Sequence, residues 1–176
     1  NLIPCTLELG GKDAMIVCAD ADLERAANGA VFGGMMNTGQ FCCSTERIYV
    51  VEAVADEFTR RVIEKVKSLK QGSDGNQDVG PMIWPKQLNV IESQMQDAQK
   101  KGAEIHCGGA RNNELGELFY KPTVLSNVTH DMSIMNDETF GPVIAIARVK
   151  DETEAVRLAN DSQYGLSGTV WTKDEA

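Results

Sequence analysis

The chain has 176 residues, a net charge of −9 and 42% hydrophobic residues, which is typical of a globular domain and not of a disordered or low-complexity segment. Acidic residues are scattered and outnumber basic ones, so we expect no nucleic-acid partner. No apolar run is long enough to cross a bilayer, and residues 1–11 lack the basic start and long apolar stretch of a signal peptide. We therefore expect a single domain, residues 1–176, with no membrane partner.

The cysteine content bears on compartment and metal binding. The cysteines are odd in number and match no zinc-binding spacing, at Cys5, Cys18, Cys42, Cys43 and Cys107. This usage indicates a reducing compartment, so we expect a cytoplasmic protein with no metal site. The chain has no initiating Met and opens in the middle of a pattern, and we interpret it as a fragment of a longer protein.

The first part of the chain alternates between apolar runs and helical patterns. In chain order we expect a strand at 14–18, a helix from Leu23 that ends in Gly33-Gly34, a strand at 47–51, and helices at 54–69 and 85–101. Asp20 or Asp22 can cap the first helix, and Pro85 suits the start of the last one.

The second part of the chain continues the alternation. We expect a strand at 104–107, an extended stretch at 120–125, a strand at 142–149, a helix at 151–159 and a strand at 166–171. Alternating strands and helices predict an α/β fold with a mostly parallel sheet.

Residues 37–43 are the first segment that points to chemistry. They connect a predicted helix to a predicted strand, and such loops at a sheet edge often present reactive residues. A thiol such as Cys42 can be exposed there, whereas Cys18 lies within an apolar run and should be buried and inert. A purely structural cysteine is the alternative, and this segment alone favours it.

Two further segments combine carboxylates with turn residues. Glu8 lies between two leucines and before Gly10-Gly11, so it is either a functional carboxylate or a surface side chain that points to water. Residues 136–142 place an acidic pair before Phe140 and a Gly-Pro turn. An ordinary acidic loop with Phe140 as a core anchor is the alternative there.

Taken together, residues 7–13, 39–42 and 138–142 resemble three signature segments of the aldehyde dehydrogenase superfamily. They occur in the family's order, and Glu8 precedes Cys42 by 34 residues, a separation typical of the family. Weaker similarities between them extend the resemblance over essentially the whole chain. It implies a Rossmann-like, mostly parallel sheet with helices on both faces, and the oxidation of an aldehyde to a carboxylic acid with NAD or NADP.

The resemblance assigns catalytic roles to two residues. Cys42 would attack the aldehyde as a thiolate, forming a thiohemiacetal and then a thioester, and its backbone amide would help to hold the oxyanion. Glu8 would activate the water that hydrolyses the thioester. Cys43 would face away into packing. Because branches of the family that transfer the acyl group to coenzyme A commonly lack the carboxylate of Glu8, its presence favours hydrolysis.

The resemblance also assigns cofactor and substrate contacts. Glu138 would accept hydrogen bonds from the nicotinamide ribose, Phe140 would pack beside that ribose, and Gln87 would lie near it. The carbonyl of Leu9 would face the nicotinamide carboxamide. Phe41 would line the pocket for a small-molecule aldehyde, which suggests an apolar or aromatic substrate.

The resemblance also sets limits on what this chain can do alone. The family's dinucleotide-binding domain precedes Glu8, and its oligomerisation strands and C-terminal segment also lie outside these residues. We therefore expect a homo-oligomeric parent enzyme and an inactive isolated chain. A non-catalytic assembly module and a cofactor-independent thiol esterase are the alternatives.

Several other residues receive no catalytic role. We interpret Lys12 as a structural partner, His106 and His130 as non-catalytic, and Trp84 and Trp171 as packing residues.

Overall fold

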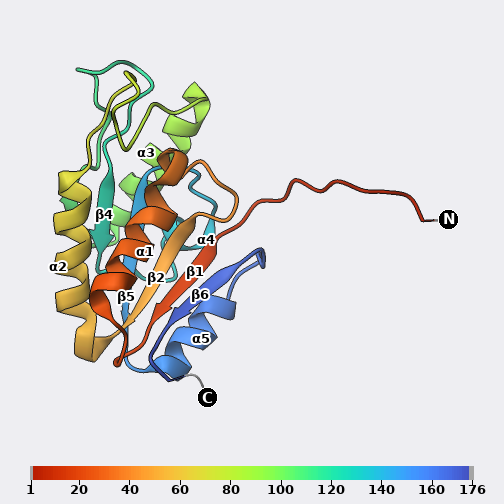
Figure 1. Cartoon of the computed structure of the whole chain (residues 1–176), viewed down its shortest axis with the longest axis vertical. Coiled ribbons are helices and arrows are strands. Elements are labelled where there is room, and N and C mark those ends of the chain that lie inside the picture. Colours follow the sequence, from red (N-terminus) through yellow and green to blue (C-terminus); the bar gives the residue numbers. More distant parts are fainter. Residues whose placement is uncertain (1, 175–176) are drawn as a thin grey trace.

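The computed structural model describes residues 2–174 and has a six-stranded sheet (Figure 1). The strands are β1 (Asp13–Val17), β2 (Thr45–Val51), β3 (Glu104–Cys107), β4 (Thr123–Ser126), β5 (Val143–Val149) and β6 (Gly168–Trp171). Their order across the sheet is β3-β4-β5-β2-β1-β6, and each neighbouring pair is parallel except β3 with β4. The predicted mostly parallel α/β sheet is therefore confirmed.

Helices cover both faces of this sheet, as predicted. They are α1 (Leu23–Met35), the 3-10 helix η1 (Met36–Gly39), α2 (Glu52–Ser68), α3 (Pro85–Lys100), α4 (Ser133–Asn136) and α5 (Glu152–Asn160). Helices α1 and α2 lie side by side on one face, and α3, α4 and α5 contribute to the core on the other (Figure 1). Asp22 caps α1, because its carboxylate accepts hydrogen bonds from the amides of Glu24 and Arg25.

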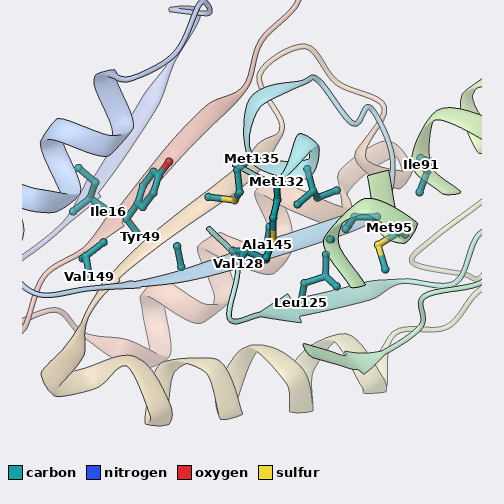
Figure 2. Packing of buried hydrophobic residues seen from close by; sticks show 14 of the residues in the cluster. Ile16, Tyr49, Ile91, Met95, Leu125, Val128, Met132, Met135, Ala145 and Val149 are labelled. Atoms are coloured by element: carbon teal, nitrogen blue, oxygen red, sulfur yellow. The ribbon is translucent and has the colours of Figure 1, made fainter. Parts of the chain in front are cut away.

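Strand β5 shows how the sequence builds two cores from one sheet. Successive side chains of a strand point to opposite faces, and in a sheet covered on both sides both sets are buried. Val143, Ala145, Ala147 and Val149 accordingly join the cluster under α3 to α5, while Ile144 and Ile146 join the cluster under α1 and α2. Figure 2 shows part of the first cluster, where the flexible side chains of Met95, Met132 and Met135 fill the space around Ala145 and Leu125.

One local expectation was close and another was wrong. Helix α1 ends at Met35, one residue beyond the predicted end at Gly33-Gly34, and these two glycines also allow close packing. A Cβ on Gly33 would lie 2.5 Å from Thr45 Oγ1, and one on Gly34 would lie 2.7 Å from Ile144 Cγ1. Trp84, interpreted as a packing residue, is 54% exposed at the start of α3. Trp171, by contrast, packs against the core under α1 as predicted.

Parallel topology places three loops at one edge of the sheet. Gly11 comes two residues before β1, Cys42 three residues before β2, and Gly141 two residues before β5. Because β5, β2 and β1 are adjacent and parallel, their amino ends lie together. Residues 2–10 have no regular secondary structure and lead away from the body of the domain (Figure 1). Within residues 2–174, no helix combines the length and apolar character that crossing a membrane requires.

Candidate active site

Glycines allow the three loops at this edge to touch through their backbones. A Cβ on Gly11 would lie 2.1 Å from the carbonyl oxygen of Cys42, and a Cβ on Gly39 would lie 2.1 Å from that of Gly141. Gly39 also has a φ of +68°, which favours glycine. The Cys42 loop is therefore packed between the loop before β1 and the loop before β5, with no room for side chains at these two points.

The Cys42 loop begins in a strained conformation. Asn37 and Thr38 have φ values of 51° and 63°, which are unusual for residues other than glycine, and above all for β-branched threonine. Hydrogen bonds to the loop before α3 hold this conformation. The hydroxyl of Thr38 donates to the carbonyl of Gly80 at 3.2 Å and accepts from its amide at 3.1 Å. The side chain of Gln40 accepts from the amide of Ile83 at 2.7 Å.

The two adjacent cysteines differ from the prediction in one respect. Cys42 is half-buried and Cys43 is exposed, so the expectation that Cys43 packs inward was wrong. Ser44 turns inward instead, and its hydroxyl donates to the carbonyl of Gly33 at 3.1 Å. Desolvation, followed by the proximity of Cys42 and Asp13, raises the pKa of the Cys43 thiol. Cys43 is therefore a poor source of thiolate at neutral pH despite its exposure.

Other thiols are also poor candidates for the nucleophile. Burial is the first cause of the raised pKa of both Cys18 and Cys107. Cys18 lies at the carboxyl end of β1 and is buried, as predicted. Cys5 is exposed in the segment that leads away from the body. Cys42 is half-buried in the loop that packs against the Gly11 turn, and its own backbone carbonyl makes that contact.

A buried ion pair lies behind the Cys42 loop. Lys12 Nζ donates to Glu46 Oε2 at 2.6 Å, and both side chains are almost fully buried. The ammonium also donates to the hydroxyl of Thr139 at 2.8 Å. Burial lowers the pKa of Lys12, and the Glu46 carboxylate opposes that shift. Removing one member of such a pair typically costs about 3–5 kcal/mol of stability, because the other charge is left buried alone. Lys12 is thus a structural partner of Glu46 and Thr139, as its position at the turn indicated.

The loop before β5 carries the two side chains predicted to contact the cofactor ribose. Glu138 is half-buried, and its Oε1 accepts a hydrogen bond from the amide of Gly11 at 2.9 Å. Phe140 is half-buried, with an unusual φ of 49°. Gln87 reaches the same loop from α3, where its side-chain amide donates to the carbonyl of Thr139 at 2.8 Å. The structure thus brings Glu138, Phe140 and Gln87 to one loop beside Gly11.

The two remaining predicted residues lie in the segment before Gly11. Leu9 is 57% exposed, and Glu8 is also exposed. Among residues 2–174, no hydrogen bond or ion pair joins Glu8 to the Cys42 loop. The structure therefore does not bring Glu8 against Cys42, although only two residues separate Glu8 from Gly11.

Sequence analysis missed Glu46 and Gln94. The side chain of Gln94, on α3, accepts from the hydroxyl of Thr139 at 2.8 Å and donates to the carbonyl of Glu138 at 3.2 Å. The sequence feature that could have revealed Glu46 is the charged pair Glu46-Arg47, which stands at the start of the apolar run that forms β2. Both residues are buried, and Arg47 donates to the carbonyl of Lys12 at 2.7 Å.

A cavity of about 730 Å³ lies elsewhere. It is situated between α2 and strands β3 to β5, and is lined in part by Arg60, His106 and Arg148. None of its lining residues belongs to the Cys42 loop. We therefore locate the candidate active site from the geometry of the loops and not from cavity size.

A half-buried cysteine and a carboxylate held by a backbone amide, both packed against the Gly10-Gly11 turn at one edge of an α/β sheet, define a candidate thiol-dependent enzyme. The sequence model of the Aldehyde dehydrogenase family matches residues 1–176, so the chain belongs to that family. A salicylaldehyde dehydrogenase of Pseudomonas putida is 45% identical over 177 residues, which cover 99% of this chain and 36% of that protein.

Solved structures agree with this assignment. The succinate-semialdehyde dehydrogenase of Burkholderia pseudomallei matches with a TM-score of 0.93 at 41% identity, over 97% of this chain and 36% of that one. A betaine aldehyde dehydrogenase of Staphylococcus aureus in complex with NAD+ matches with a TM-score of 0.90 at 42% identity, over 95% of this chain and 34% of that one. The chain spans about a third of the length of these relatives.

Proposed function

We propose that this chain carries the nucleophile of an NAD(P)-dependent aldehyde dehydrogenase, which oxidises a small aldehyde to its carboxylic acid. The observation that carries the proposal is the meeting of the Cys42 loop, the Gly11 turn and the Glu138 loop at the amino edge of β1, β2 and β5. The relatives named above are dehydrogenases of three different aldehydes. Phe41, 40% exposed next to Cys42, favours an apolar or aromatic aldehyde.

The residues of this loop fit a nicotinamide cofactor. One oxygen of Glu138 is held by the amide of Gly11, and the other lies 2.9 Å from where a Cβ on Gly10 would be. Glycine at position 10 thus leaves the carboxylate free to accept hydrogen bonds from ribose hydroxyls. Phe140 would pack beside the same ribose, and the carbonyl of Leu9 and the side chain of Gln87 would complete the contacts. When bound, the cofactor supplies the acceptor for the hydride.

The chemistry of the acyl group would take place on Cys42. Its thiolate attacks the aldehyde carbonyl and forms a thiohemiacetal. Within residues 2–174 the amide of Cys42 donates to no acceptor of the chain, so it is available to stabilise the oxyanion. Loss of a hydride then converts the thiohemiacetal into a thioester on Cys42.

Glu8 would complete the reaction as the general base. Its carboxylate takes a proton from water, and that water attacks the thioester, releasing the carboxylic acid and restoring the thiol. Three residues of extended chain span about 10 Å, so movement of the segment before Gly11 is sufficient to bring Glu8 to the thioester.

Adjacent cysteines provide a matched test of this proposal. In the full-length protein that carries this chain, we expect Cys42→Ser to reduce aldehyde oxidation by about a thousandfold or more, and Cys43→Ser to leave it within about threefold. Labelling with iodoacetamide at pH 7, followed by peptide mass spectrometry, should modify Cys42 first. Faster labelling of Cys43, or full activity in Cys42→Ser, would assign the nucleophile elsewhere. Ester hydrolysis by the isolated 176-residue chain, without cofactor, would instead favour a thiol esterase.

The role of Glu8 is tested in the same protein. Glu8→Gln should slow turnover by about a hundredfold while the first equivalent of reduced cofactor still forms, because only thioester hydrolysis needs the base. Intact-protein mass spectrometry would then detect the acyl group on Cys42. An equal loss of the first equivalent would show that Glu8 acts before the thioester forms.

A further inference from the structure

Glu46 is a buried carboxylate that the proposed chemistry does not use. It lies four residues after Cys42, as the second residue of β2, and its side chain is 2% exposed. Its two oxygens accept from different groups. Oε1 accepts from the amide of Phe140 at 2.8 Å, and Oε2 accepts from the amide of Thr139 at 2.8 Å and from Lys12 Nζ at 2.6 Å.

These contacts join the three loops of the candidate site through one side chain. The backbone of Glu46 continues the Cys42 loop, Lys12 follows the Gly11 turn, and the two amides belong to the loop that carries Glu138 and Phe140. The amide of Phe140 is bound while that residue has a φ of 49°, so the carboxylate stabilises an otherwise unfavourable conformation. A charged acceptor with two oxygens suits two successive amides better than a neutral side chain does.

We infer that Glu46 is a positioning residue, which holds the loop bearing Glu138 and Phe140 in a fixed place relative to Cys42. The inference rests on the proposed function, because it gives that loop its cofactor-binding role. Glu46 touches neither the substrate nor the reacting atoms. It acts through the backbone of residues 139 and 140, and its loss should disturb the cofactor contacts while leaving the thiol in place.

The variant Glu46→Gln keeps the length of the side chain but has a single acceptor oxygen. Its amide group would meet hydrogen-bond donors, either a backbone amide or the ammonium of Lys12. In the 176-residue chain, we expect amide hydrogen exchange of residues 137–141 to become at least about tenfold faster, while exchange in α2 stays within about twofold. Glu154→Gln is the control, because Glu154 also accepts a backbone amide, that of Lys150, at 2.8 Å, but lies in α5.

A second variant removes the complication of an unpaired buried charge. Lys12→Met combined with Glu46→Gln replaces the ion pair by neutral side chains of similar volume, a change that proteins often tolerate. The same selective increase in exchange at residues 137–141 is expected there. Uniformly faster exchange throughout the double variant would show that Glu46 stabilises the whole fold and does not position this loop. Unchanged exchange at residues 137–141 would also overturn the inference.

Kinetics of the full-length protein separate positioning from general stability. We expect Glu46→Gln to raise the KM for the cofactor by at least about tenfold and to change the rate of Cys42 alkylation by less than about threefold. If cofactor binding and the rate of Cys42 alkylation were weakened by equal factors, a positioning role would be contradicted. A wild-type protein without dehydrogenase activity would refute the proposed function, whereas the exchange measurement would still report whether Glu46 holds the loop.

Discussion

His130 is a partly buried histidine on the face of the sheet opposite α1 and α2. Its Nε2 lies 2.6 Å from the hydroxyl of Tyr49, and its Nδ1 lies 3.6 Å from a carboxylate oxygen of Asp161. Desolvation is the first cause of the lowered pKa of His130, the positive charges of Arg47 and Arg157 reinforce it, and Asp161 opposes it. The folded protein therefore disfavours the imidazolium form.

The lowered pKa of His130 predicts a direction for stability against pH. When the folded-state pKa lies below the unfolded value of about 6.5, the unfolded state binds more protons between the two values, and stability falls as pH falls through that window. His130→Gln removes this titration. We expect urea unfolding of the variant to depend less on pH between about 7 and 5 than that of the wild type.

Asp161→Asn is the complementary variant for this prediction. It removes the carboxylate that opposes the shift, so the pKa of His130 should fall further and the dependence on pH should become steeper. An unchanged slope in His130→Gln would assign the pH dependence to other groups.

At the scale of elements, the Cys42 loop depends on the backbone approach between Gly39 and Gly141. Gly39→Ala combines an unfavourable φ of +68° with a Cβ 2.1 Å from a carbonyl oxygen. We expect a loss of about 2–3 kcal/mol in the free energy of unfolding, measured by urea denaturation with an unchanged m-value. Gly75→Ala is the matched control, because Gly75 has a φ of +91° but nothing within 4 Å of the added Cβ. Gly75→Ala should lower the free energy of unfolding by only about 1 kcal/mol. Equal losses in the two variants would show that the close approach of Gly39 to Gly141 adds nothing to the cost of the positive φ.

Elements were predictable from the sequence where their signal is local. The apolar run at residues 14–18 and the helical spacing at residues 54–69 come within one or two residues of β1 and α2, because burial on a sheet face or a helix stripe leaves a periodic pattern. The contacts within the candidate site were harder to predict from the sequence. The hydrogen bonds from Lys12 to Glu46 and to Thr139 span 34 and 127 residues of sequence, so no local sequence pattern predicts them. The exposure of Cys43 likewise depends on how Ser44 packs against Gly33.

At the scale of the whole molecule, the position of the candidate site within the sheet limits what this chain can bind. Dinucleotides bind open parallel sheets at the carboxyl ends of the strands, whereas the loops of Cys42 and Glu138 lie at the amino ends. The carboxyl end of β1 carries Asp20, whose carboxylate accepts from the amide of Lys173 at 2.8 Å. An acidic side chain at that edge would repel a pyrophosphate.

We therefore expect the 176-residue chain to bind NAD+ and NADP+ with dissociation constants above about 1 mM in calorimetric titration, and to show no dehydrogenase turnover. One carboxylate and one aromatic ring bury little of a dinucleotide, so these contacts alone should give weak binding. The full-length protein is the control, and Glu138→Gln should weaken its cofactor binding by about tenfold. Micromolar binding by the 176-residue chain would contradict this prediction.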